Sequence, residues 1–125
     1  MVIILTSIDS AFDELQFFAK VKERPALLLG KKSFLSFRDV LFGMEYAFSF
    51  YNKETPLKYF KSFVMWYHEE ILEDKNGYAC WWNHILYTSG NSDDCALDLF
   101  FRKFEQYLHD VHNVRLPEVA SSCTF

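Results

Sequence analysis

The chain has 125 residues, a length that fits one domain and is enough to bury a substantial core. Half of its residues are hydrophobic, and 14 Phe, 7 Tyr and 3 Trp offer large surfaces for burial, which argues against a disordered chain. The formal net charge of −4 lacks the excess of Lys and Arg that holds a phosphate backbone, so we expect no direct binding of nucleic acid.

The cysteines and the N-terminal residues indicate the cellular compartment in which we expect the protein. Cys80, Cys95 and Cys123 show no metal-binding spacing, and we expect small buried apolar residues rather than a disulfide framework. The apolar run 2–5 is too short for a signal peptide or a membrane span, and no basic segment precedes it. These features predict a cytoplasmic protein that does not enter a membrane.

The first predicted helix follows Asp9 or Ser10 and ends near Pro25. Ser10 with Asp13 resembles a capping box. The apolar positions of this segment share one helical face: Ile8, Phe12, Leu15 and Ala19. The run 26–29 fits either a buried helical turn or an extended piece, and the pattern leaves both open.

A second helix is predicted from Ser33 or Ser36 to about Tyr51. Its apolar residues recur at steps of three and four, at Phe34, Phe37, Leu41, Met44, Phe48 and Tyr51. More apolar residues lie off that stripe, at Leu35, Phe42, Tyr46 and Phe50. A helix that is apolar nearly all round is usually central, so we expect this one to be the core helix.

Thr55 and Pro56 fit the N-cap and first position of a third helix, which continues to about Glu73. Its predicted end is at Asn76-Gly77, because glycine suits the left-handed position after a helix. A short fourth helix is predicted over residues 78–87.

The last helix begins with Asp93 and Asp94, which favour the positive end of its dipole. Its apolar stripe is the clearest in the chain: Leu97, Phe100, Phe101, Phe104, Leu108 and Val111. Residues 114–125 are interpreted as a tail. Because short loops between helices favour antiparallel neighbours, residues 1–125 are predicted to form an all-α, single-domain bundle of about five helices.

No metal site emerges from the histidines. His68 begins a zinc-protease-like segment, but Leu72 stands where the second histidine ligand belongs. His109 and His112 are three residues apart and, with His84, form the remaining candidate for a metal. Histidines near a helix C-terminus are more often placed by the helix dipole, so we expect no metal.

The sequence also shows no complete set of catalytic groups. Cys80 and His84 lie four residues apart, but no third group is positioned to orient them. The four glycines form no phosphate-binding loop. We therefore expect no catalytic residues, no cofactor and no enzymatic activity.

Charge is distributed unevenly along the chain. Between Trp66 and Asp98 there are seven acidic residues and a single base, Lys75, whereas the stretch 20–38 is rich in Lys and Arg. The acids fit either solvated helix ends or a docking face for a cationic protein. On the second interpretation the partner-binding residues are Glu69, Glu70, Glu73, Asp74, Tyr78, Trp82, Asp93, Asp94 and Asp98.

Three stretches within residues 20–110 resemble the small helical immunity proteins of bacterial contact-dependent inhibition and related polymorphic toxin systems. The first comprises 24–30, Ser33-Phe34 and 41–44. The second comprises 63–67, Gly77-Tyr78 and 81–86. The third comprises 92–94, Ala96-Leu97 and 100–108.

The resemblance implies a one-to-one inhibitor of a toxin nuclease domain, with a ribonuclease as the first expectation. Such a toxin is expected to be basic because it binds RNA or DNA. The inhibitor would cover the active or nucleic-acid-binding site of the toxin. The alternative interpretation is a non-enzymatic helical adaptor or a homo-oligomeric interaction module, because a fold does not dictate a function.

Overall fold

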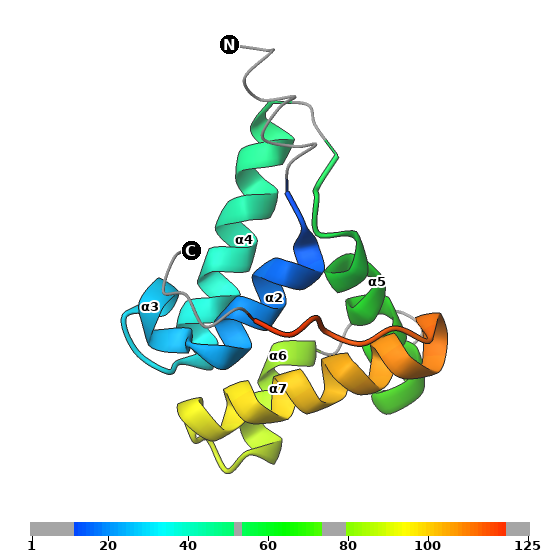
Figure 1. Ribbon diagram of the computed structural model, residues 1–125. Coiled ribbons are helices and arrows are strands. Elements are labelled where there is room, and N and C mark those ends of the chain that lie inside the picture. Colours follow the sequence, from blue (N-terminus) through cyan, green and yellow to red (C-terminus); the bar gives the residue numbers. More distant parts are fainter. Residues whose placement is uncertain (1–11, 52–53, 74–79, 120–125) are drawn as a thin grey trace.

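The computed structural model describes residues 12–51, 54–73 and 80–119, and within them six helices and no strand are found (Figure 1). The helices are α2 (Glu14–Glu23), α3 (Pro25–Leu29), α4 (Phe34–Phe50), α5 (Lys58–Trp66), α6 (Trp81–Thr88) and α7 (Asp93–Tyr107). The π-helical turns η1 (Tyr67–Ile71) and η2 (Leu108–His112) extend α5 and α7. The predicted all-α fold of about five helices is confirmed.

The core is a cluster of aromatic side chains arranged around α7. Phe100 is 0 % exposed, and its ring lies 5.4–6.2 Å from those of Phe18 in α2, Phe37 in α4, Phe63 in α5 and Trp81 in α6. The apolar stripe predicted for this helix is buried except at its last residue, Val111. The central helix of the fold is therefore α7.

The expectation that α4 is the core helix is wrong. Only Phe34, Phe37 and Leu41, all in its first half, are buried. Its second half projects from the rest of the fold, leaving aromatic side chains such as Tyr46 exposed (Figure 1). The helix is about 25 Å long, and α7 covers only the end where Phe37 stacks on Phe101.

Several helix boundaries differ from the sequence prediction in detail. Asp13 is itself the N-cap of α2 and accepts a hydrogen bond from Gln16 N at 3.1 Å, whereas Ser10 lies outside the described residues. The open question at 26–29 is answered by a helical turn that begins at Pro25, and none of its residues is buried. Gly30 ends this turn with a left-handed φ of 77° and donates to Ala26 O.

Two helices begin at carboxylates supplied by other helices. The carboxylate of Glu14 in α2 accepts hydrogen bonds from Tyr59 N at 2.8 Å and Phe60 N at 2.7 Å. This carboxylate satisfies backbone donors at the start of α5, which begins after Leu57 rather than at Thr55. Asp93 of α7 accepts from Leu35 N of α4 in the same way.

The first part of the predicted tail packs against the fold. Asn113 adopts a left-handed conformation with φ 54°, which ends η2. Val114 and Leu116 then pack against the core in a non-helical segment that reaches residue 119. No helix in the described ranges is both long and apolar enough to cross a membrane.

We expect Phe100→Ala to lower the free energy of unfolding by about 3–5 kcal/mol, because it leaves a cavity where aromatic rings from four other helices meet. Denaturant unfolding followed by circular dichroism measures this loss. Tyr87→Ala is the control, since Tyr87 is 77 % exposed, and it should change stability by no more than about 0.5 kcal/mol. Equal losses in both variants would contradict the central role of α7.

Burial raises the pKa of Glu14 above its ordinary value of 4.5, and the hydrogen bonds from backbone N–H groups oppose this shift only in part. Between pH 4.5 and the raised pKa, the folded state therefore holds more protons than the unfolded state. We expect this contribution to stability to be full below pH 4.5 and to be lost as pH rises through that window. The comparison of wild type with Glu14→Gln in unfolding experiments from about pH 4 to about pH 6 isolates the effect, because the variant cannot titrate.

Candidate protein-binding surfaces

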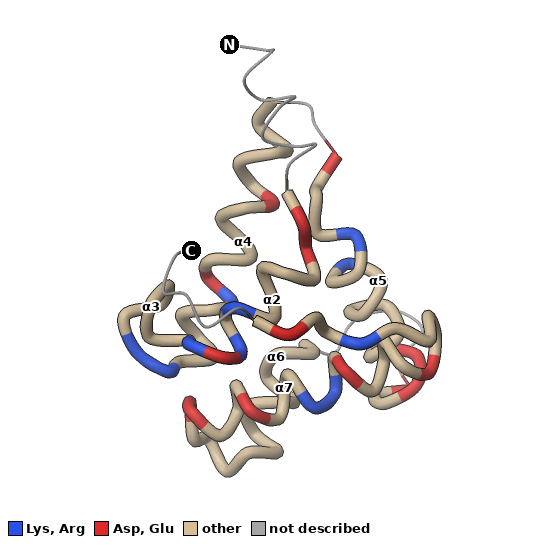
Figure 2. The backbone as a smooth tube through the Cα atoms, viewed as in Figure 1, with Lys and Arg blue, Asp and Glu red and all other residues tan. Residues whose placement is uncertain are grey.

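The predicted acidic residues divide between the start of α7 and the C-terminal end of α5. Phe63 of α5 packs on Phe104 of α7 at 5.4 Å, and Trp66 packs on Tyr107 at 5.6 Å, so the C-terminal end of α5 lies against the C-terminal half of α7. The start of α7 lies about 21 Å from its end. Figure 2 shows acidic segments at the start of α7 and, separately, at the end of α5. The single acidic face expected from the sequence is therefore not formed.

At the start of α7, Asp93 and Asp98 are engaged with the neighbouring segment. Asp93 accepts hydrogen bonds from the Ser33 hydroxyl at 2.5 Å and from Leu35 N at 2.9 Å. Asp98 forms an ion pair with Lys32 at 2.8 Å. These contacts join the acidic stretch to the basic stretch 20–38, so Asp93 and Asp98, both predicted as partner contacts, also hold α7 against the segment that leads into α4.

Asp94 accepts hydrogen bonds within the start of its own helix, α7. Its carboxylate accepts from the Ser92 hydroxyl at 2.6 Å and from Cys95 N at 2.8 Å. These hydrogen bonds stabilise the charged form and lower the pKa of Asp94. Asp94 thus acts at the N-terminus of α7 as its sequence position predicts, and it remains exposed there.

The C-terminal ends of α5 and α7 form a second acidic region, here called the acidic end, which comprises Glu69, Glu70, Glu73 and Asp110. All four residues are exposed. Each helix C-terminus adds about half a negative charge through its dipole. Sequence reasoning overlooked Asp110, which lies apart from the other acids along the chain and contacts His109 at 3.0 Å. The predicted residues Asp74 and Tyr78 lie outside the described residues.

Two of the histidines considered as metal ligands, His84 and His112, form hydrogen bonds with buried tyrosines. The Tyr67 hydroxyl lies 2.6 Å from His84 Nδ1, and the Tyr107 hydroxyl lies 2.7 Å from His112 Nε2. Burial raises the pKa of Tyr67 to about 12, so its phenol stays protonated at neutral pH. In the described part of the chain, no three His, Cys, Asp or Glu side chains are grouped so as to hold a metal.

The cysteines depart from the expectation of burial. Cys95 is exposed in the first turn of α7, so the prediction is wrong at this position. Cys80 is partly buried at the N-cap of α6, and both cysteines are free thiols. Cys123 lies outside the described residues.

An exposed row of aromatic side chains on the projecting half of α4, here called the α4 ridge, consists of Phe42, Tyr46 and Phe50. Their exposed fractions are 45 %, 73 % and 73 %. In the sequence, the ridge is visible as aromatic residues that recur every four positions outside the main apolar stripe. The apolar pattern predicts that these residues belong to the core, but the structure leaves them exposed. Trp82, a predicted contact residue, lies near the base of the ridge, where the Arg38 guanidinium is 4.3 Å from the Trp82 ring centroid and 5.9 Å from that of Phe42.

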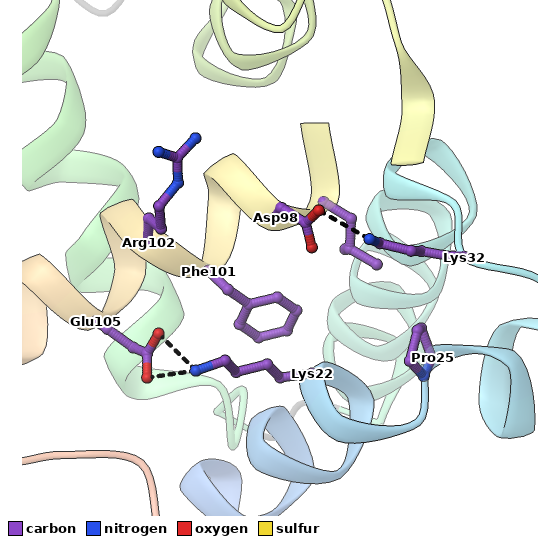
Figure 3. Close-up of a pocket in the computed structure, with 8 residues that line it drawn as sticks. Lys22, Pro25, Lys32, Asp98, Phe101, Arg102 and Glu105 are labelled. Carbon is purple, nitrogen blue, oxygen red and sulfur yellow. Dashed lines mark hydrogen bonds and ion pairs between the residues drawn. The ribbon is translucent and has the colours of Figure 1, made fainter. Parts of the chain in front are cut away.

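A small pocket between α2, α3 and α7 is occupied largely by ion pairs (Figure 3). Lys22 pairs with Glu105 at 2.9 Å and Lys32 with Asp98 at 2.8 Å, on either side of the ring of Phe101. Its volume of 190 Å³ is below that of ordinary small-molecule sites. We interpret it as a contact region in which ion pairs hold α7 against α2 and the segment that follows α3.

Comparisons of the chain with protein-family models, with curated proteins and with solved structures found no match.

We expect Asp93→Ala to lower the free energy of unfolding by about 1–2 kcal/mol, because α4 loses a carboxylate that accepts from its first turn. Thermal or denaturant unfolding provides the measurement. The matched control, Glu70→Ala, removes an exposed carboxylate and should stay within about 0.5 kcal/mol of wild type. An Asp93 variant as stable as wild type would show that these hydrogen bonds do not stabilise the start of α4.

Proposed function

We propose that this chain is an immunity protein that binds a cationic toxin nuclease and blocks its active or nucleic-acid-binding site. The resemblance of residues 20–110 to small helical immunity proteins suggests the class. The all-α fold, with two distinct surfaces suited to protein contact, is compatible with it.

The observation that carries the proposal is the acidic end. Four exposed carboxylates lie in or next to the turns that extend α5 and α7, and neither η1 nor η2 contains Lys or Arg. A concentration of negative charge of this kind speeds encounter with a positively charged protein and disfavours partners of like charge. A nuclease is a suitable partner because its binding cleft carries positive charge for the phosphate backbone.

Apolar side chains accompany the charges at this end. Met65 is 60 % exposed in the last turn of α5, one turn before Glu69. Val111 is exposed in η2 beside Asp110. In protein interfaces a few apolar anchors supply much of the affinity, while surrounding charges supply orientation. A stable complex would need about 800 Å² from each partner.

The mechanism that follows is occlusion. The acidic end occupies the cationic groove that otherwise holds nucleic acid, so the toxin loses access to its substrate. This requires no bond to be made or broken by the inhibitor. Neutralisation then depends on the lifetime of the complex, which interface contacts determine more than the rate of encounter does.

The test uses the purified toxin domain encoded at the end of the gene immediately upstream. We expect Glu69→Lys/Glu70→Lys/Glu73→Lys to slow its association at low ionic strength by at least about tenfold and to flatten the salt dependence of the rate. Stopped-flow fluorescence gives the rates, and protection of toxin-expressing cells gives the biological outcome.

The matched control reverses three exposed acids away from the acidic end: Glu23→Lys, Glu54→Lys and Glu118→Lys. It changes the net charge equally, so it should retain most of the association rate if position matters. Equal slowing in both triple variants would show a general charge effect and reject the acidic end. An upstream gene that encodes no secreted toxin domain would reject the class itself.

A further inference from the structure

We propose that two copies of this chain associate through the projecting half of α4, with the two helices packed antiparallel about a two-fold axis. This inference concerns a surface that the proposed toxin contact leaves free, and it does not depend on that proposal.

The α4 ridge supplies one half of the packing. Phe42, Tyr46 and Phe50 lie four residues apart on one face, so they form a row about 12 Å long. Tyr51 continues the exposed aromatic surface at the end of the helix. With aromatic side chains of about 150–250 Å² each, the exposed parts of these four residues amount to roughly 500 Å².

A row of small residues beside the ridge supplies the other half, because short side chains leave a groove between the ridges of a helix. Gly43 and Ala47 are both exposed and lie four residues apart, in the row adjacent to the aromatic side chains. A Cβ built on Gly43 would meet no atom within 4 Å, so nothing else in the structure needs a glycine there. Glycine inside a helix weakens it, but the absence of a side chain lets another helix approach closely.

Ridge and groove on the same helix make this surface complementary to itself. When two such helices pack antiparallel, the ridge of each lies in the groove of the other, which is the isologous arrangement of a two-fold dimer. The exposed aromatic area is more than half of the roughly 800 Å² that each partner contributes to a stable interface.

Charge also favours a second copy over a cationic partner here. Glu45 is the one charged residue among residues 42–51, and it is partly buried. Two copies therefore meet with little repulsion despite a net charge of −4 per chain. A cationic protein has more to gain at the acidic end, which lies on other helices.

The first experiment is sedimentation velocity with the full chain over a range of concentrations. We expect a species of twice the chain mass of 14.9 kDa to be populated by about 100 µM. A chain that stays monomeric at that concentration overturns the proposal.

Two variants locate the interface. Gly43→Leu fills the groove and should weaken dimerisation by at least about tenfold, whereas the described residues of other segments leave open space around the position of its Cβ. Tyr46→Glu places a charge in the ridge and should have a similar effect. Far-UV circular dichroism checks that both variants remain folded. Tyr87→Glu is the control at an equally exposed tyrosine of α6, and it should leave the dimer intact. A dimer that survives both α4 substitutions overturns the proposal.

A third pair of variants tests the two-fold axis, which would pass near Tyr46 and Ala47 at the middle of the surface. Ala47→Asp and Ala47→Lys should each be monomeric alone, because each places like charges face to face. An equimolar mixture should form dimers again, since opposite charges then meet. No recovery on mixing would show that the contact is not of this isologous kind and would overturn the antiparallel arrangement.

Failure of the dimer and failure of the proposed function are distinguishable. The first is measured with this chain alone, and the second with the toxin domain. Gly43→Leu should bind the toxin domain at the wild-type rate even when it is monomeric. Loss of toxin binding in that variant would mean that the toxin, rather than a second copy, occupies the α4 ridge.

Discussion

The packing of Phe100 is the constraint on which the rest of the fold depends. Its ring contacts aromatic rings from α2, α4, α5 and α6, so each of these helices is positioned against one point of α7. Helices arranged in this way begin close to their neighbours, where the backbone N–H groups of a first turn are shielded from water. Such groups need acceptors. The carboxylates of Glu14 and Asp93 provide them at α5 and α4, and both acids come from neighbouring helices.

Because the N–H groups at a helix start need acceptors, acidic residues beside the start of a helix differ from acidic residues beside its end. A helix start offers N–H donors, so a carboxylate there gains hydrogen bonds and a favourable dipole. A helix end offers carbonyl oxygens, which repel a carboxylate. Glu69 and Asp110 lie in the terminal turns η1 and η2 and remain exposed, whereas Asp93 is engaged with α4. The acids of the acidic end therefore lie where a helix terminus offers no N–H donors to them.

The apolar pattern of the sequence was sufficient to predict the helices but not their coverage. Periodicity located α7 and its buried stripe, because a narrow stripe leaves only one way to pack. In α4 the apolar residues surround the helix, and the pattern is the same whether Tyr46 is covered by core or exposed. The number of acidic residues in a stretch of sequence has a similar limit, because it does not distinguish Asp93 from Glu69. Only the fold brings Ser33 and Leu35 to Asp93. Asp110 was overlooked because it is distant from α5 along the chain, and only the packing of Trp66 on Tyr107 brings the ends of α5 and α7 together.

The two exposed surfaces suit different physical tasks. Charge at the acidic end acts over a Debye length of about 10 Å, and salt weakens it, so it governs how fast a partner arrives. Aromatic contacts on α4 act only at close range and resist salt, so they govern how long an association lasts. Because the α4 ridge and the acidic end lie on different helices, both can be engaged at once. A dimer of this kind would keep two negative ends free for two cationic partners, and the affinity of each end would be independent of the other unless α7, which packs against both α4 and α5, changes position.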